Sequence, residues 1–357
     1  MRKVSALVII AAAIVGAAGS LSKPVLAQDK AAEVLSNMRK AIGDGKLDSL
    51  RTFSLEGKTA RNIADRQMTS NIELYLEMPD KYLRVDNITA PMAVTMTAGF
   101  NGDKAIRPSG GPMGGGAQMV VSYGGPVSGG GGGMTMTTQV NGNAGGGSRG
   151  GGPMTPEQQA MVNATMIRSQ RVELSRMMLG WFGQAHPGLN AKYTYAGEAE
   201  SPDGKAHIID IKADGGFEAK LFVDQATSMP LMVTYQGFEQ MTMQSGPRGG
   251  GPGQPVVPGG TPPPAPPTGG TATAPVPPPA GGQSQMTQEQ AQKRMEEMMK
   301  NRKMIEYRVF FGDWKEVDGI QFPHTLQRAV GGTTTEEWTI SKVKVNPKID
   351  AKKFSTQ

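Results

Sequence analysis

Residues 69–77 of the chain read Thr-Ser-Asn-Ile-Glu-Leu-Tyr-Leu-Glu, and this stretch decides the fold. Ile72, Leu74 and Leu76 alternate with more polar residues, so the three apolar side chains share one face of an extended strand. A strand with one apolar face and one polar face fits a sheet that is buried on one side only, and such sheets are typically antiparallel.

Similar patterns predict further strands, and short turns join many of them. The turns at residues 78–81, 202–204 and 318–319 contain Pro, Asp or Gly, and such short connections make the flanking strands antiparallel neighbours. In the last strand the apolar phase changes between Ile340 and Val343, which predicts a β-bulge. The other predicted strands cover residues 51–60, 82–88, 92–100, 191–197, 206–212, 217–223, 231–236, 304–311, 322–330 and 333–345.

Three helices are predicted to be available to cover the apolar face of this sheet. They begin at residue 28 or 29, at residue 155 and at residue 287, and the second ends near residue 181. The second and third begin with capping boxes, Thr-Pro-Glu-Gln and Thr-Gln-Glu-Gln. Their apolar stripes contain Ala31, Val34, Leu35, Met38 and Ile42; then Ala164, Ile167, Leu174, Met178 and Trp181; then Met295, Met298 and Met299. We therefore expect a mainly β (α+β) protein with a single large curved antiparallel sheet, covered by two to three helices.

Two long low-complexity tracts interrupt the chain. Residues 109–152 are rich in Gly, and residues 245–283 are a mixture of Pro, Gly, Thr and Ala. Neither tract can bury enough apolar surface to offset the entropy of ordering it, so we expect disordered loops. Within the first tract, residues 118–123 and 134–140 have the composition of strands. The expected organisation is a signal peptide, 1–27, and one domain, 28–357, with two insertions.

The first 27 residues have the pattern of a cleavable signal peptide. Basic Arg2 and Lys3 precede an apolar run that extends from Val4 to about Leu21, and the small residue Ala27 precedes the expected cleavage site. The alternative is a membrane anchor, but the run is interrupted by Gly and Ser and is short for a span of about 20 residues. We therefore expect a soluble protein of the periplasm that carries no lipid anchor.

Composition argues against two classes of function. The chain has no Cys, so it forms no disulfide and offers no thiolate to a metal or a substrate. Its formal net charge of +6 falls to +3 when Arg2, Lys3 and Lys23 leave with the signal peptide, and the remaining basic residues are scattered. No nucleic-acid-binding surface is expected.

The sequence offers no set of residues for catalysis or cofactor binding. Its three histidines, His186, His207 and His324, are not at metal-binding spacing. Neighbouring carboxylates such as Glu336 and Glu337 point to opposite faces of a strand. The 24 methionines are dispersed, which favours packing or an adaptable apolar surface over a copper site. We expect a protein that is not an enzyme and holds neither cofactor nor metal.

An ordered series of segments resembles the outer-membrane lipoprotein-sorting proteins, the LolA/LolB-like superfamily, in one of its divergent branches. The resemblance covers most of the chain outside the two tracts and rests on the order of the segments more than on any one of them. The segments are residues 47–57, 74–82, 100–104, 221–231, 314–323 and 345–354.

The resemblance implies an unclosed antiparallel barrel whose helices act as a lid over an apolar cavity for acyl chains. In the chaperone branch a basic residue just before the hairpin proline helps to hold the lid shut; Met78 occupies that position here. The expected cavity residues are Ile72, Leu74, Leu76, Val94, Met96, Leu221 and Val223, and the expected lid residues are Ile167, Leu174, Met178 and Trp181. The alternative is that the helices fill this face as a solid core.

The expected function is a periplasmic carrier of lipid or lipoprotein acyl chains, in lipoprotein sorting or envelope lipid traffic. We expect a monomer, with an inner- or outer-membrane protein as a further partner. The alternative is a non-catalytic envelope sensor or protein-interaction module on the same fold.

Overall fold

The computed structural model describes residues 24–63, 66–88, 94–106, 117–123, 134–140, 155–202, 204–238 and 303–355. They belong to one compact unit, composed of residues 1–239 and 303–357, and residues 240–302 form a second unit. The Pro-rich tract and the third predicted helix fall in that second unit and lie outside the described residues.

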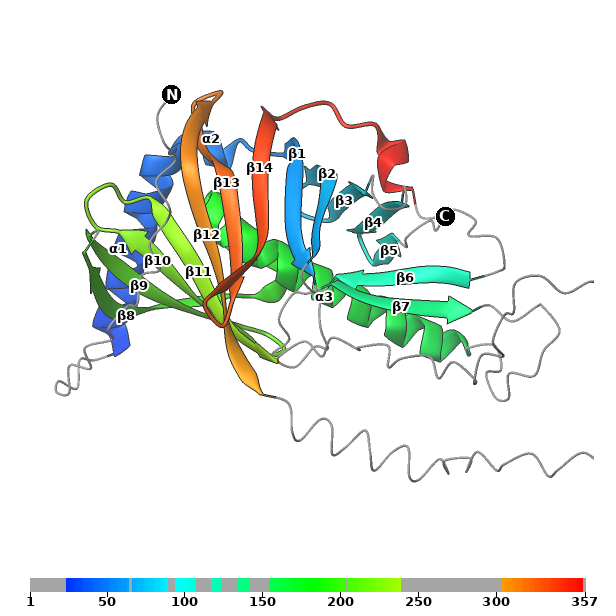
Figure 1. Cartoon of the computed structure of the whole chain (residues 1–357). Coiled ribbons are helices and arrows are strands. Elements are labelled where there is room, and N and C mark those ends of the chain that lie inside the picture. The colour runs from blue at the N-terminus through cyan, green and yellow to red at the C-terminus, as the bar shows by residue number, and fades with distance from the viewer. Residues whose placement is uncertain are drawn as a thin grey trace, which may run out of the picture. The chain divides into compact units, whose positions relative to one another are not determined.

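Twelve strands form one antiparallel sheet that does not close, as the sequence predicted. In sheet order the neighbours are β5 (Lys104–Ile106), β4 (Val94–Asn101), β3 (Lys81–Ile88), β2 (Arg66–Glu77), β1 (Thr52–Ile63), β14 (Thr333–Val345), β13 (Ile320–Val330), β12 (Met304–Val317), β11 (Pro230–Phe238), β10 (Phe217–Asp224), β9 (Gly204–Ala213) and β8 (Lys192–Ser201). Figure 1 shows the curvature of this sheet, with β5 and β8 at its two edges. The fold class is therefore a mainly β unclosed barrel.

A separate two-stranded sheet lies within the Gly-rich tract. Its strands are β6 (Ala117–Tyr123) and β7 (Met134–Val140), which pair antiparallel. They coincide with the two patches of strand-like composition. The strands that this composition predicted are therefore present, because their Met, Val, Thr and Tyr residues favour extended backbone. The rest of the tract lies outside the described residues.

The predicted bulge in the last strand is confirmed, and it restores the apolar phase of that strand. Gly57 of β1 is opposite Ile340, whereas the preceding Glu56 is opposite Lys342, so Ser341 is the extra residue. A side chain could not replace the hydrogen of Gly57, because a Cβ there would overlap with the backbone of Thr339. Ile340 and Val343 thus face the same side of the sheet, although three positions separate them.

The helices cover the concave side of the sheet. In Figure 1 α3 (Pro156–Phe182, green) runs across this side, and α1 (Pro24–Ile42, blue) packs beside β8. The described helices also include α2 (Gly45–Asp48) and the 3-10 turns η1 (Pro187–Leu189) and η2 (Ala351–Phe354). Both long helices bury their predicted stripes, although Ala164 at the N-terminal end of α3 stays exposed. α1 begins a few residues earlier than predicted, at Pro24, a residue favoured at the first helical position.

Part of the convex face is covered as well, by the C-terminal segment. Phe354 of η2 is buried against Leu83 and Ile106, in a small cluster separate from the main core. Lys353 lies over the ring of Tyr75, with its Nζ 3.9 Å from the ring centroid. The polar face of β2 is therefore a packing surface at this position.

Gly180 is the point where α3 approaches the sheet most closely, because a Cβ there would overlap with the ring of Phe311 on β12. We predict that Gly180→Ala lowers the melting temperature. The overlap costs about 1–3 kcal/mol, which outweighs the gain in helix propensity of up to about 1 kcal/mol. Gly45→Ala is the matched control, because nothing lies within 4 Å of the added methyl group. Thermal unfolding followed by circular dichroism tests this, and a Gly180→Ala protein as stable as Gly45→Ala would contradict it.

Candidate functional site

Six of the seven predicted cavity residues are buried. Met96 is buried but lies outside the main hydrophobic cluster, and the side chain of Val94 lies outside the described part of the chain. The members of that cluster are Ile72, Leu74 and Leu76 from β2, and Leu221 and Val223 from β10. The structure therefore gathers strands from both halves of the sequence onto one apolar surface.

The predicted lid residues pack on this surface. Ile167, Leu174, Met178 and Trp181 of α3 all belong to the same cluster and are at most 5% exposed. In this arrangement α3 lies directly against the sheet residues that were expected to line a cavity. The ligand-binding role of these residues stays a prediction.

The C-terminal end of α3 is anchored among aromatic rings. Phe53 of β1 stacks on Phe322 of β13, with 4.6 Å between ring centroids. Phe182 meets both rings edge-on, each at 5.8 Å, and Trp181 lies 5.8 Å from Phe53. Aromatic pairs at such distances add specific geometry to the area that they bury. This end of the concave face is entirely apolar in character.

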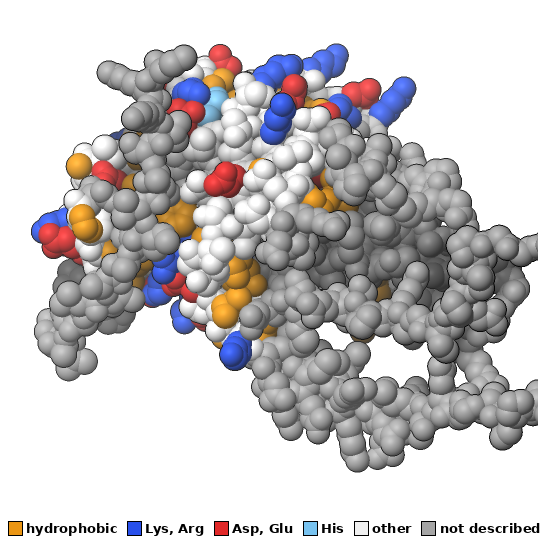
Figure 2. All heavy atoms as spheres, viewed as in Figure 1, with side chains coloured by type: hydrophobic (Ala, Val, Ile, Leu, Met, Phe, Trp, Pro, Cys, Tyr) orange, Lys and Arg blue, Asp and Glu red, His pale blue; other side chains and the backbone are white. Residues whose placement is uncertain are grey.

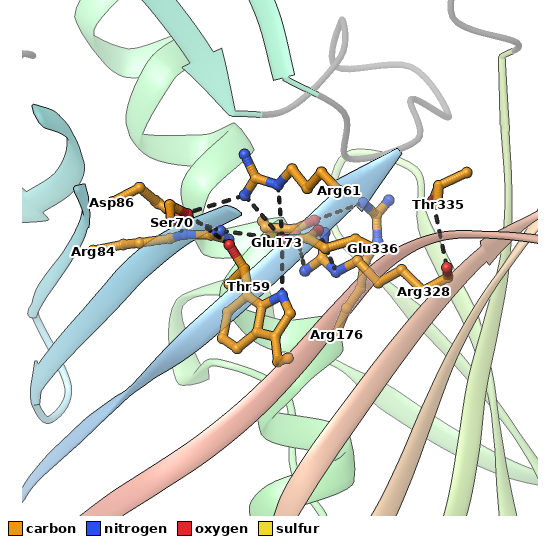
Figure 3. A network of polar contacts seen from close by, with 11 residues as sticks. Thr59, Arg61, Ser70, Arg84, Asp86, Glu173, Arg176, Arg328, Thr335 and Glu336 are labelled. Atoms are coloured by element: carbon orange, nitrogen blue, oxygen red, sulfur yellow. Dashed lines mark hydrogen bonds and ion pairs between the residues drawn. The ribbon is translucent and has the colours of Figure 1, made fainter. Parts of the chain in front are cut away.

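A group of buried charges lies further along the same strands, and the sequence analysis did not predict it. Figure 3 shows guanidinium and carboxylate groups converging beneath α3. We call it the charge cluster; its members are Arg61 of β1, Arg84 and Asp86 of β3, Arg328 of β13, Glu336 of β14, and Glu173 and Arg176 of α3.

Glu336 is the centre of the charge cluster. Its Oε1 accepts hydrogen bonds from Arg61 Nε at 2.9 Å, Arg84 Nη2 at 3.3 Å and Trp338 Nε1 at 2.8 Å. Its Oε2 lies 3.6 Å from Arg328 Nε. Strand register explains this convergence, because Glu336 is directly opposite Arg61 on one side and Arg328 on the other. One carboxylate thus joins β1, β13 and β14.

Asp86 provides a second negative centre. Arg84 binds it with two hydrogen bonds, Nε to Oδ2 at 2.8 Å and Nη2 to Oδ1 at 3.0 Å, and Arg61 Nη2 lies 3.5 Å from Oδ1. Asp86 is fully buried. A buried carboxylate is tolerated only when it is paired in this way.

Glu173 joins α3 to the charge cluster. Its carboxylate forms an ion pair with Arg328 of β13, and its Oε2 accepts a hydrogen bond from Arg176 Nη1, one turn along the helix, at 3.3 Å. The Arg176 guanidinium lies 3.6 Å above the ring of Tyr235, which in turn stacks on Tyr307. Polar contacts therefore attach the middle of α3 to the sheet.

Two carboxylates of the charge cluster, Glu336 and Glu173, have pKa values below their usual range. Burial alone would raise the pKa of Glu336, but Arg61, Arg328 and Arg84 outweigh it and hold the pKa far below its usual range. Burial opposes ionisation of Glu173 as well, and Arg328 and Arg176 outweigh it, so its pKa is lowered. Carboxylates with such low pKa values are poor general bases at neutral pH. The arrangement is suited to holding charge rather than transferring protons.

Gln170 Oε1 and Trp181 Nε1 are among the buried polar atoms of α3 that lack a hydrogen-bond partner. An unmade buried hydrogen bond costs about 1–3 kcal/mol. The contact between α3 and the sheet is therefore not optimised throughout.

His186 attaches the segment after α3 to the β2–β3 hairpin. Its ring is buried, its Nε2 lies 2.6 Å from the carbonyl oxygen of Pro79, and its Nδ1 accepts a hydrogen bond from Gly188 N at 3.1 Å. These bonds define a neutral imidazole, and burial lowers its pKa. The hairpin is thus tied to the helix by His186, whereas Met78 packs against the hydrophobic core.

The alternation of residues along β3 and β14 could have indicated part of the charge cluster from the sequence alone. Arg84 and Asp86 alternate in step with buried Tyr82 and Ile88, and Glu336 does so with Trp338. A charged residue in phase with the apolar face of a strand indicates a buried charge. The opposite orientations predicted for Glu336 and Glu337 are confirmed, since the first is buried and the second exposed.

The face drawn in Figure 2 carries no comparable concentration of charge. Basic and acidic side chains lie mixed along its upper edge, and hydrophobic side chains form small separate groups. Within the described residues, no three His, Asp or Glu side chains are placed to hold a metal ion. None of the described helices is both long and apolar enough to cross a lipid bilayer. The charge cluster beneath α3 is therefore the candidate site.

We predict that Glu336→Gln lowers the free energy of unfolding at pH 7 by about 3–5 kcal/mol, because it leaves buried arginines without their shared carboxylate. The folded-state pKa of Glu336 lies below the unfolded value of about 4.3. The ionised carboxylate of Glu336 thus makes its full contribution to the free energy of unfolding above about pH 4.3. This contribution is lost as the pH falls toward the folded-state pKa. The difference between wild type and variant should therefore narrow from pH 5 to pH 3 in urea titrations.

Glu337→Gln is the matched control, since it makes the same change one residue further on, on the exposed face of β14. It should leave the unfolding free energy nearly unchanged at every pH. A gap between wild type and Glu336→Gln that stays constant with pH would contradict the charged role of Glu336.

No protein-family model matches the chain, and no curated protein matches it. Among solved structures the chain is similar to a LolA superfamily protein from Nitrosomonas europaea, with 8% identity and a TM-score of 0.43, covering 91% of this chain and 97% of that one. It is also similar to a DUF1329 family protein from Desulfovibrio piger, with 10% identity and a TM-score of 0.40, covering 94% and 98%. A domain named for outer membrane lipoprotein sorting, from Vibrio parahaemolyticus, has 10% identity and a TM-score of 0.40, covering 92% and 97%. These are the structures among which the sequence resemblance placed the chain, and at such identities and TM-scores they carry no inference about its ligand.

Proposed function

We propose that this protein is a carrier that binds the acyl chains of lipids or lipoproteins on the concave face of its sheet, under α3. It acts outside the cytoplasm, in the periplasm, in lipoprotein sorting or envelope lipid traffic, and without catalysis. The observation that carries the proposal is the layer arrangement: α3 lies on a continuous apolar sheet surface, and polar contacts at a few points attach it and the segment after it to the sheet.

The energetics permit exchange of α3 for an acyl chain. Each buried methylene of a chain gains about 0.8 kcal/mol, so a chain of ordinary length can replace the apolar contacts that α3 gives up. The contacts that an acyl chain cannot replace are polar, and they include Glu173 of α3 with Arg328 and His186, in the segment after α3, with Pro79. Some polar atoms of the helix, such as Gln170 Oε1, are unsatisfied in the closed arrangement and gain water when the helix lifts.

Movement of α3 can be tested with a reversible lock. Asn163 of α3 contacts β5 directly: its Oδ1 accepts a hydrogen bond from Ala105 N at 3.0 Å, and its Nδ2 donates to Asp103 O at 2.8 Å. We predict that the double variant Asn163→Cys/Ala105→Cys, once oxidised, excludes a fluorescent fatty-acid probe because α3 is fixed to the sheet. Dithiothreitol should restore binding, and fluorescence titration measures both states.

The wild-type chain is the control for the reductant, because it contains no Cys. Its probe binding should not depend on dithiothreitol. Equal binding by the oxidised and reduced variants would show that α3 does not open. A delipidated wild-type protein that binds no probe would remove the carrier proposal and favour a module that acts through its surface.

Export gives a separate prediction. Ala31 is the first residue of α1 that is buried among those whose side chains are described, so cleavage after Ala27 leaves the packed face of the helix intact. We predict a mature protein that begins at Gln28 in the periplasmic fraction, as measured by intact mass. Protein that retains Met1 and stays in membranes after carbonate extraction would contradict this and indicate an anchor.

A further inference from the structure

The concave face has two ends of different chemistry along the same strands. On β1 the inward-facing residues run from Phe53, in the aromatic group, to Arg61, in the charge cluster. At about 3.3 Å per residue, the two positions are about 26 Å apart. On β13 the same change occurs from Phe322 to Arg328. An apolar stretch that ends in buried charges matches a molecule with an apolar chain and a polar head.

The sheet part of the charge cluster has one positive charge in excess. It contains three arginines, Arg61, Arg84 and Arg328, but two carboxylates, Asp86 and Glu336. The helix part, Glu173 and Arg176, is neutral as a pair, so the same excess remains while α3 is in place. A bound anion would neutralise this excess, which is favourable for a buried charge.

Arg328 is the arginine that depends on the helix for its anion. The Oε1 of Glu336 is already shared by Arg61, Arg84 and Trp338, and the Oε2 is 3.6 Å from Arg328 Nε. The closer partner of Arg328 is the carboxylate of Glu173 on α3. Lifting α3 would therefore take the principal counter-charge away from Arg328.

We infer that Glu173 stands in for the anionic head group of the ligand. When α3 lifts, the carboxylate or phosphate of an anionic amphiphile takes the place of Glu173 at Arg328, and its acyl chain lies on the apolar surface toward Phe53 and Phe322. The inference rests on the proposed carrier function and narrows its ligand from acyl chains in general to amphiphiles with a negatively charged head.

The polar surroundings of Glu173 agree with this exchange. Gln170 precedes Glu173 by three residues on the same face of α3, and its Oε1 is buried without a partner. Arg176 contributes a guanidinium beside Glu173, held over Tyr235. Gln170 and Arg176 leave with α3 when it lifts, so that Gln170 Oε1 gains water, and the ring of Tyr235 on β11 stays beside the head-group position.

The test compares two probes with the same chain, dodecanoate and 1-dodecanol, by isothermal titration calorimetry at pH 8 on the delipidated, full-length mature protein. Wild type should bind dodecanoate about tenfold more tightly than dodecanol, since a charge-assisted hydrogen bond is stronger than a neutral one. In Glu173→Gln the competing carboxylate is gone, so the ratio of the two affinities should rise by about a further tenfold. Circular dichroism checks that the variant is folded.

The double variant Glu173→Gln/Arg328→Gln keeps the inference testable if the single variant is unstable, because it removes both charges together. Its affinity ratio should fall to about one, since the guanidinium that would bind the negatively charged head group has been removed. Equal affinities of wild type for dodecanoate and dodecanol would overturn the inference and leave the carrier proposal standing. Binding of neither probe would overturn both.

Inorganic phosphate distinguishes a lipid head group from a free anion. Sodium phosphate alone should not displace dodecanoate at comparable concentration, because it lacks the chain that fills the apolar surface. Displacement by phosphate at such concentrations would show a simple anion site and would overturn the assignment of an amphiphile.

Discussion

The pairing of β1 with β14 is the constraint on which the rest of the structure depends. It joins two segments from opposite ends of the chain, Phe53 opposite Val345 and Arg61 opposite Glu336. Through it the strands before and after the long tracts become one sheet, with one apolar side for the helices. The bulge at Ser341 keeps both ends of this pairing in phase, so that Ile340 and Val343 both face inward. Without that extra residue, either the aromatic end or the charged end of β14 would point to the solvent.

The same pairing creates the chemical contrast along the concave face. Close-packed apolar residues fill one end of the concave face, and their burial provides most of the folding free energy. Buried ion pairs such as Arg61 with Glu336 contribute little net stability, because desolvation offsets their attraction. These ion pairs instead make the arrangement specific, because a buried guanidinium can form its hydrogen bonds in only a few orientations. The charge cluster therefore determines the position of α3 on the sheet. The apolar cluster makes it favourable for α3, or an acyl chain, to cover this surface.

The sequence predicted the architecture wherever the alternation of apolar and polar residues agreed with the residues expected in short turns. Residues 69–77 identified the one-sided sheet, and the phase change near Ile340 identified the bulge. It did not reveal the charge cluster as a whole. Strand phase marks Arg84, Asp86 and Glu336 as buried, but the other members come from two more strands and a helix. Arg328 and Glu173 become partners only once β13 and α3 have been placed, and no local pattern encodes that pairing. Likewise no local pattern predicts the contact of His186 with Pro79, because that contact depends on the tertiary fold.

An ion pair between α3 and the sheet has a consequence that apolar packing alone would lack. Exchange of apolar helix side chains for an acyl chain is nearly neutral in free energy, since both bury similar surface, and it would not discriminate among ligands. The carboxylate of Glu173 changes this, because an incoming molecule must either provide an anion for Arg328 or leave its charge without close compensation. A neutral chain then pays a penalty that an anionic one avoids. In this view one interaction of Arg328 serves both purposes. In the empty protein Arg328 binds Glu173 and holds α3 closed, and in the loaded protein it binds the head group and selects an anionic ligand.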